Sequence, residues 1–338
     1  MTQTVQQQPT SVVFDTFFGH QKTAALKAAI ELDLFTAIAE GYDTAPRLAE
    51  RCRAAERGVR ILADGMTVIG LLTKKDQTYQ LTQESAMLLD ARSPAYMGKA
   101  ADFLVSPDLM RAYDHMTEAV RRGGTTLNDG GTIAPEHPAW IAFATSMRAF
   151  AALPAQAAAR HLSPLPGGAR VLDIAASHGE YGMSILRSNP QARVVAVDWA
   201  NVLKLTRQFV AEAGLADRWE ALPGSAFDVD LGTGYDAALV PNFVHHFEPE
   251  RIVAFYRRLH AALNPGGRVA LLEFVPNEDR VSPPIPASFS MTMLATTAQG
   301  DAYTEKQHQA MLAEAGFNRV EVHPIPPTPQ TLILASRP

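Results

Sequence analysis

The apolar positions in the second half of the chain alternate between short continuous runs and longer amphipathic segments. The short runs predict strands near residues 170–175, 193–197, 218–222, 236–240, 268–274, 319–323 and 331–335. The longer segments predict helices near residues 180–188, 200–213, 249–263 and 304–315. This alternation is typical of a parallel sheet with helices on both faces, in which ligands bind beyond the carboxyl ends of the strands. Glycines that follow predicted helices are expected to cap them: Gly214, the pair Gly266 and Gly267, and Gly316.

The first half of the chain is predicted to be mostly helical. Apolar residues recur at near-helical spacing from Val12 to Ala39, and two further helices are expected, one ending at Cys52 and one from Arg57 to Gly70. A short hairpin follows, so the order of elements is that of a winged helix. We interpret it as a dimerisation module. DNA binding is the alternative, because four arginines cluster near these helices: Arg51, Arg53, Arg57 and Arg60. Glutamates interleave with these arginines in the sequence.

Composition limits the class of protein. The chain has 338 residues, enough for two domains, and its formal net charge of -5 argues against a general nucleic-acid binder. The single cysteine, Cys52, excludes an internal disulfide. No signal peptide opens the chain, and no apolar run approaches the roughly 20 residues that span a bilayer. We therefore expect a cytoplasmic protein with no nucleic-acid or membrane partner.

The segment VLDIAASHGEYG, residues 171–182, has the pattern of a strand, a tight turn of small residues and a helix. Such a turn places backbone N–H groups beside a ligand. A second predicted strand ends at Asp198, about 20 residues farther on, where a carboxylate can accept hydrogen bonds from ribose hydroxyls. Together these features predict a nucleoside cofactor, with a plain helix-packing turn as the alternative.

Two strand ends carry groups suited to proton transfer. His245 and His246 follow the predicted strand at 236–240, and Glu273 ends the strand at 268–274. If these strands are neighbours, His245 and Glu273 form a general base with an orienting carboxylate. A metal site is less favoured, because consecutive side chains on a helical turn diverge by about 100° and no further metal-ligand pattern accompanies the histidines. A surface histidine pair is the other alternative.

An aromatic and methionine stripe precedes the predicted sheet. Phe143, Met147 and Phe150 fall on one face of the helix expected after Trp140. A stripe of this kind is usually core, and it can also line a pocket.

The order of the segments VLDIAASHG, AVDW, LPGSAF, LVPNFVHHF, LNPGGRVALLEFVP and SMTMLATTAQGDAYTEKQHQAMLAEAGF resembles the S-adenosylmethionine-dependent O-methyltransferases of the caffeic acid and bacterial polyketide-tailoring type. The resemblance covers nearly the whole chain. It implies a class I methyltransferase, Rossmann-like α/β sheet, mostly parallel with a final antiparallel strand, and an N-terminal, mostly α winged-helix dimerisation domain. The expected divisions are a tail at 1–10, the dimerisation domain at 11–100, a helical linker and pocket region at 101–165 and the cofactor domain at 166–338.

The resemblance also implies a site. The cofactor residues would be Asp173, Ala175, Ser177, Gly179, Asp198, Trp199, Ser225, Ala226, Phe227 and Asn242. The catalytic residues would be His245 as base, Glu273 as its support, and Asp301, which lies beside Ala302 where a second supporting carboxylate is usual. The substrate pocket would include Phe143, Met147, His246, Phe289 and Met293. A homodimer is implied, in which the partner helps to close the active site.

The implied activity is methyl transfer from S-adenosylmethionine to a hydroxyl of a small aromatic or polyketide-like molecule, with S-adenosylhomocysteine as product. The alternatives are C- or N-methylation, hydroxylation or a pericyclic reaction on the same fold, and a DNA-binding regulator that senses the cofactor. The sequence departs from the family pattern at Ala175 and Ser177, where glycines are usual. At the remaining glycine, Gly179, we expect a leucine to intrude where the cofactor passes.

Overall fold

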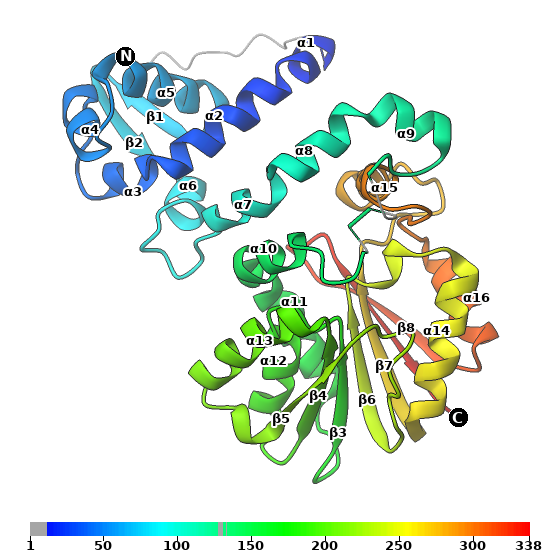
Figure 1. Ribbon diagram of the computed structural model, residues 1–338. Coiled ribbons are helices and arrows are strands. Elements are labelled where there is room, and N and C mark those ends of the chain that lie inside the picture. Colours follow the sequence, from blue (N-terminus) through cyan, green and yellow to red (C-terminus); the bar gives the residue numbers. More distant parts are fainter. Residues whose placement is uncertain (1–11, 128–130, 133) are drawn as a thin grey trace. The chain divides into compact units, whose positions relative to one another are not determined.

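The computed structural model describes residues 12–127, 131, 132 and 134–338 (Figure 1). The expected tail at 1–10 lies outside the described residues. The chain divides into two compact units, with the first ending at Val105 and the second beginning at Ser106. The helices between Ser106 and the sheet therefore belong to the same unit as the sheet. No helix among the described residues is long and apolar enough to cross a membrane.

The first unit is mostly helical and contains the predicted hairpin. Its elements are α1 (Val12–Phe17), α2 (Gly19–Glu31), α3 (Leu34–Ala39), α4 (Ala45–Arg51), α5 (Glu56–Ile69), β1 (Leu72–Lys75), β2 (Thr78–Leu81), α6 (Gln83–Leu88), η1 (Gly98–Ala100) and α7 (Ala101–Leu104). The apolar face of α5 packs against α2, α4 and β1, and it buries Val59, Ala63 and Met66. Helix, helix and antiparallel hairpin thus follow in the order expected of a winged helix.

The continuous helix expected over residues 12–39 is broken into three. Asp33 adopts a left-handed backbone conformation, with φ of 58°, and separates α2 from α3. Two of the clustered arginines are held by neighbouring carboxylates, because Arg51 binds Glu40 at 2.7 Å and Arg60 binds Asp64 at 2.8 Å. Their charges are therefore partly neutralised within the unit.

The second unit is built on a seven-stranded sheet. Its elements are α8 (Pro107–Asp114), α9 (Met116–Arg122), α10 (Ala139–Ser146), α11 (Arg148–Leu162), β3 (Arg170–Ile174), α12 (Glu180–Ser188), β4 (Arg193–Asp198), α13 (Ala200–Glu212), η3 (Ala216–Arg218), β5 (Trp219–Pro223), β6 (Tyr235–Pro241), η4 (Val244–His246), α14 (Pro249–Ala262), β7 (Leu263–Glu273), α15 (Pro284–Thr296), α16 (Glu305–Glu314), β8 (Asn318–Pro324) and β9 (Thr331–Ser336). All seven strands and the four helices expected from the apolar pattern are present.

The strands lie in the order β5-β4-β3-β6-β7-β9-β8. The pairs among β5, β4, β3, β6 and β7 are parallel, whereas β9 runs antiparallel to both β7 and β8. The order reverses direction between β3 and β6, so the carboxyl ends of these two strands flank the point where a doubly wound sheet binds its ligand. The residues that follow β3 and β6 are therefore placed at one site.

Alternate residues of each strand face different helical layers, which Figure 1 shows on the two sides of the sheet. Leu172 and Ile174 pack in the core that includes α14 and α16, whereas Val171 packs in the core that includes α11 and α12. This period of two is the reason the strands are apolar on both faces. Asp173 falls in the same series as Val171 and so points toward α12.

Two details of the sequence prediction are wrong. Gly266 and Gly267 do not cap α14, which ends at Ala262; they lie inside β7, where Gly266 has φ of 79°. Pro265 cannot continue a helix, and the chain enters the strand directly. The helix expected around Met147 is also interrupted, because α10 ends at Ser146 and α11 begins at Arg148, which leaves Phe150 exposed.

Candidate active site

The turn between β3 and α12 is formed by three left-handed residues. Ala175, Ser177 and Gly179 have φ of 52°, 48° and 75°. Residues with a Cβ rarely adopt this conformation, so the chain keeps the backbone that glycines would adopt even where it carries alanine and serine. Both positions at which glycines were expected thus have left-handed backbone in this chain.

Asp198 fixes the turn from the neighbouring strand. Its Oδ2 accepts a hydrogen bond from Ser177 N at 2.8 Å, and its Oδ1 accepts one from Trp199 N at 2.7 Å. Burial raises the pKa of Asp198 to about 6, and the two backbone N–H groups oppose that shift. A carboxylate has about four acceptor positions, so Asp198 keeps lone pairs for a ligand that enters beside the turn.

Asp173 lies beneath the same turn and is fully buried. Its Oδ2 accepts a hydrogen bond from Gly182 N at 3.0 Å, while its Oδ1 has no partner among the residues that the structure describes. Burial raises the pKa of Asp173 to about 8. The Ser177 hydroxyl is also buried and has no hydrogen-bond partner within the described part of the chain.

His178 also lies at this turn, although no sequence motif pointed to it. The residue is 3% exposed, and its Nδ1 accepts a hydrogen bond from Glu180 N at 3.2 Å, so the proton of the neutral ring is on Nε2. Burial, and secondarily Arg148, lowers the pKa of His178 to about 3. The only sequence signal was its position inside the small-residue turn.

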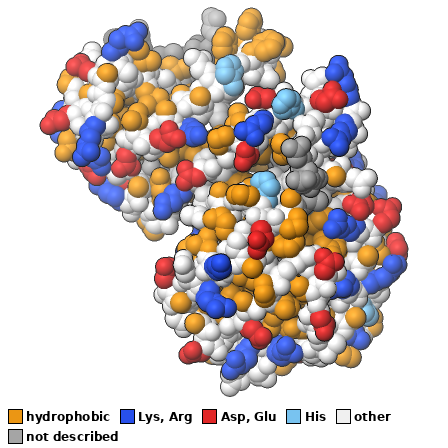
Figure 2. Space-filling view, in the orientation of Figure 1, with side chains coloured by type: hydrophobic (Ala, Val, Ile, Leu, Met, Phe, Trp, Pro, Cys, Tyr) orange, Lys and Arg blue, Asp and Glu red, His pale blue; other side chains and the backbone are white. Residues whose placement is uncertain are grey.

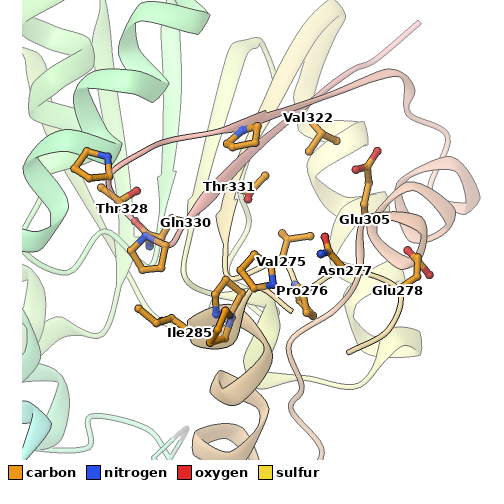
Figure 3. Close-up of a pocket in the computed structure, with 16 residues that line it drawn as sticks. Val275, Pro276, Asn277, Glu278, Ile285, Glu305, Val322, Thr328, Gln330 and Thr331 are labelled. Carbon is orange, nitrogen blue, oxygen red and sulfur yellow. The ribbon is translucent and has the colours of Figure 1, made fainter. Parts of the chain in front are cut away.

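Asn242 connects the end of β6 with the loop that precedes β9. Its Oδ1 accepts a hydrogen bond from Gln330 Nε2 at 2.5 Å, and its backbone is left-handed, with φ of 51°. Gln330 also lines a groove of about 640 Å³ between the segment after β7 and the β8–β9 loop (Figure 3). Gln330 was not predicted, because it follows a proline-rich loop with no local motif. One side chain thus joins the groove to the carboxyl end of β6.

The other expected cofactor residues lie at the ends of β4 and β5. Trp199 is the N-cap of α13 and directly follows Asp198. Ser225 and Ala226 follow β5, and the Ser225 hydroxyl accepts a hydrogen bond from Phe227 N at 3.2 Å. The ring of Phe227 packs against Phe247, with centroids 4.7 Å apart, and so faces the aromatic core. The segment is positioned mainly by this packing.

His245 and Glu273 meet at the carboxyl ends of β6 and β7, as expected for neighbouring strands. His245 Nδ1 lies 2.5 Å from Glu273 Oε2, and both side chains are buried. Glu273 Oε1 accepts hydrogen bonds from Phe243 N at 3.1 Å and Val244 N at 3.0 Å. The carboxylate therefore holds both the imidazole and the backbone that carries it, which leaves His245 Nε2 for another partner.

The ring of His246 lies closer to that of His245 than the expected divergence of about 100° predicts. The two rings are 4.3 Å apart at an interplanar angle of 35°, so the consecutive side chains do not diverge. His246 Nδ1 donates to Phe243 O at 3.1 Å, which anchors both rings to the same backbone. Burial, and secondarily His245, lowers the pKa of His246 well below its ordinary value. No group of three potential metal-binding side chains occurs among the described residues.

The carboxylate of Asp301 is directed away from the His245 imidazole. It binds Arg280 at 2.8 Å, while its backbone N donates to His245 O at 2.9 Å. Ala302 is fully buried beside it and offers no carboxylate. Asp301 thus contacts the backbone of His245, and within the described residues Glu273 is the carboxylate that contacts its ring.

A series of aromatic and histidine rings joins the two parts of the site. Going from α15 toward the turn after β3, neighbouring rings in the series have centroids 4.1 to 6.2 Å apart, in the order Phe274, Phe289, His245, His246, Trp140, Phe143, His178 and Tyr181. Three residues expected in the substrate pocket belong to it, Phe143, His246 and Phe289. Met293 is buried on α15, and Met147 is half-buried between α10 and α11.

Comparison with known families explains this arrangement. The O-methyltransferase domain family matches residues 131–318, more than half of the chain, and the O-methyltransferase dimerisation domain family matches residues 14–91. The chain belongs to the O-methyltransferase family. As a member it is an enzyme that uses S-adenosylmethionine as methyl donor.

Three relatives show how far this O-methyltransferase resembles known proteins. A Nostoc punctiforme protein with an inferred O-methyltransferase function is 42% identical, and its structure matches with a TM-score of 0.94 over 98% of this chain and 100% of the other. The 3-hydroxy-5-methyl-1-naphthoate 3-O-methyltransferase of Streptomyces sahachiroi is 29% identical over 92% of this chain and 90% of the relative. The L-tyrosine C(3)-methyltransferase of Streptomyces lavendulae is 28% identical over 89% and 85%. The predicted fold class is confirmed.

Proposed function

We propose that this O-methyltransferase methylates a phenolic hydroxyl of a small aromatic molecule of polyketide type, with His245 as general base. The observation that carries the proposal is the 2.5 Å contact between His245 and Glu273 at the strand ends beside the turn. The ring series supports an aromatic acceptor, because flat π surfaces pack well against one another. The naphthoate 3-O-methyltransferase among the relatives acts on a compound of this kind.

The residues at the turn fit the cofactor. Asp198 has lone pairs for ribose hydroxyls, and the sealed atoms Asp173 Oδ1 and Ser177 Oγ have no partner in the described part of the chain. Unpartnered polar atoms are typical of a site that a polar ligand completes. The remaining expected cofactor residues, from Trp199 to Asn242, line the same edge of the sheet. When bound, S-adenosylmethionine supplies an electrophilic methyl group on a sulfonium.

His245 receives the proton of the acceptor in this proposal. Its Nδ1–H donates to Glu273, so the neutral ring presents an unprotonated Nε2. A phenol with a pKa of about 10 and an imidazole near 6.5 differ by about 3.5 units, so complete proton transfer before methyl transfer would cost about 5 kcal/mol. Proton loss is therefore concerted with attack, and Glu273 stabilises the imidazolium that forms. The apolar rings around the pair exclude water.

Replacement of His245 by alanine tests this role. We expect turnover to fall at least about 100-fold, because general-base catalysis contributes a factor of that size, while cofactor affinity stays within about twofold. The measurements are S-adenosylhomocysteine formation with a panel of phenols and calorimetric titration with S-adenosylmethionine. Wild-type turnover in the variant would remove His245 from the mechanism, and a parallel loss of cofactor binding would assign it a structural role.

Methylation of carbon is a second candidate, favoured by the similarity to the tyrosine C(3)-methyltransferase. Deprotonation of a phenol by His245 also activates the adjacent ring carbon, so the same residues serve both reactions. Nuclear magnetic resonance of the product separates them, because a methoxy group and an aryl methyl group have distinct carbon shifts. We expect the methoxy product.

A further inference from the structure

Polar atoms without partners are buried behind the His245–Glu273 pair, on the face of the sheet covered by α14 and α16. His308, on α16, is 1% exposed, and neither of its ring nitrogens has a hydrogen-bond partner among the described residues. The hydroxyl of Tyr256, on α14, is also buried and unpartnered in that part of the chain. Native proteins rarely leave such atoms unsatisfied, so this group needs an explanation.

These atoms lie around Glu273. The ring of Tyr303 meets the ring of His308 edge to face, with centroids 6.0 Å apart. Glu273 continues the strand series of Val269 and Leu271, which pack in the same core as Tyr256 and Tyr303, so its side chain lies on the face covered by α14 and α16. Burial raises the pKa of Tyr256, and Glu273 adds to that shift; burial lowers the pKa of His308, and Glu273 opposes that shift.

Glu273 can accept one more hydrogen bond. Within the described part of the chain three donors reach it, namely Phe243 N, Val244 N and His245 Nδ1, whereas a carboxylate has about four acceptor positions. Burial lowers the pKa of His308 to about 4, so its ring is neutral at pH 7, with one nitrogen as donor and the other as acceptor.

We propose that His308 and Tyr256 enclose a buried water site behind Glu273, and that His308 acts through this water as a positioning residue for the Glu273–His245 pair. One or two ordered waters would supply partners for the His308 ring and the Tyr256 hydroxyl, and a donor for the remaining lone pair of Glu273. The inference rests on the proposed function, because the role of the pair is proton transfer from the acceptor.

The water site favours the form of the pair that accepts a proton. With His245 neutral and Glu273 ionised, the pair has a net charge of -1, and protonation of His245 brings it to zero. Polar groups behind Glu273 stabilise the form of the pair with net charge -1. Removal of these groups therefore raises the apparent pKa at which the pair loses its proton. The other titratable groups nearby are Tyr303, His246 beside His245, and the surface ion pair of Asp301 with Arg280.

The test replaces His308 by phenylalanine, which fills the same space without nitrogen atoms, and by glutamine, which keeps a donor and an acceptor. The ring resonances of His245 are followed from pH 5 to 10 in the full chain by nuclear magnetic resonance and are assigned by their loss in His245→Gln. We expect His308→Phe to raise the apparent pKa of the pair by about one unit, a tenfold shift in the protonation equilibrium. His308→Gln should stay within about 0.3 units of the wild-type value.

Turnover should follow the same pattern. Below the apparent pKa of the pair, His308→Phe should turn over about tenfold more slowly than the wild type, and this difference should become smaller at higher pH. Tyr256→Phe removes one hydroxyl from the water site, so it should raise the pKa by a smaller amount, and it serves if His308→Phe does not fold. His260→Phe, on the same face of α14 but packed against Phe317, is the control and should change nothing.

An unchanged pKa in both His308→Phe and Tyr256→Phe would overturn the proposal. So would equal shifts in His308→Phe and His308→Gln, because the effect would then follow from packing. The resonance titration needs no methyl acceptor. Failure of every phenol to be methylated would therefore count against the proposed function, while the pKa values of the His245–Glu273 pair would still decide this inference.

Discussion

The carboxyl group of Asp173 is held in a protonated state by its surroundings. It is fully buried, and Gly182 N, its one donor among the described residues, only partly compensates for burial, which raises its pKa to about 8. In the unfolded chain the same group titrates near 3.9. Between about pH 4 and pH 8 the folded protein therefore binds a proton that the unfolded chain has released. The stability contributed by the protonated carboxyl is complete below pH 4 and is lost as the pH rises toward 8.

Asp173→Asn tests this linkage, because the amide keeps the shape of the side chain and an oxygen acceptor for Gly182 N. We expect the free energy of unfolding of the wild type to fall by up to about 1.4 kcal/mol per pH unit from this group, and the variant to lack that slope. Urea unfolding at pH 6.5, 7, 7.5 and 8 without cofactor measures both proteins. Asp198, with a pKa of about 6, titrates mostly below this window in both. Parallel pH dependences would show that Asp173 is already ionised in the fold.

At the scale of elements, the turn after β3 depends on the packing of α13. A Cβ added to Gly179 would lie 2.8 Å from Thr206 Cγ2 and 3.6 Å from Val210 Cγ2, both on α13. A side chain at this position was expected to obstruct the cofactor. The structure gives a different first obstacle, because the missing side chain leaves room for α13 to approach the turn. Gly179 is therefore needed for helix packing and for its positive φ.

A double-mutant cycle between Gly179→Ala and Thr206→Ser measures this contact. Gly179→Ala should lower the free energy of unfolding by about 1–3 kcal/mol through overpacking and the left-handed backbone. Thr206→Ser removes the methyl group and keeps the hydroxyl that donates to Ser177 O and Val202 O. It should restore about 1 kcal/mol of the loss. Additive effects of the two changes would mean that the backbone conformation alone makes glycine necessary.

The order of elements could be predicted because apolar period and strand length are local properties. The same holds for the positions of Asp198, His245 and Glu273, since strand ends can be located from the pattern and parallel neighbours bring such ends together. The roles of these residues stay predictions. The boundaries near Gly266 and Met147 were wrong, because local signals for a cap and for a continuous helix were overridden by strand pairing and by the packing of two shorter helices.

Other features of the site depend on contacts between distant segments. Asp301 faces Arg280, which lies 21 residues away, and no local pattern reveals that ion pair. His178 and His308 resemble ordinary turn and helix residues in the sequence; only the packed structure shows that both rings are buried. Gln330 reaches Asn242 across 88 residues. Burial and long-range partners therefore account for most of what the sequence pattern missed.

At the scale of the whole molecule, the described part of the first unit exposes several large apolar side chains. They gather over α1, as the orange side chains in that region of Figure 2 show. Phe14 is 58% exposed and Phe17 is 67% exposed. Exposed apolar patches of this kind mark interaction surfaces. Because residues 14–91 match the O-methyltransferase dimerisation domain, we propose that α1 contributes to a homodimer interface.

The double replacement Phe14→Asp and Phe17→Asp tests the homodimer. Two carboxylates per chain in an apolar interface would lose their hydration without gaining partners, so association should weaken by at least about 100-fold. In sedimentation velocity at micromolar concentration we expect the wild type at twice the chain mass of 36.6 kDa and the variant at that mass. Val281→Asp, an exposed apolar position in the second unit, is the control and should stay dimeric. A dimeric double variant with wild-type stability would place the interface elsewhere in the first unit. If the partner subunit helps to close the active site, the monomeric variant should also lose turnover while its second unit still binds S-adenosylmethionine.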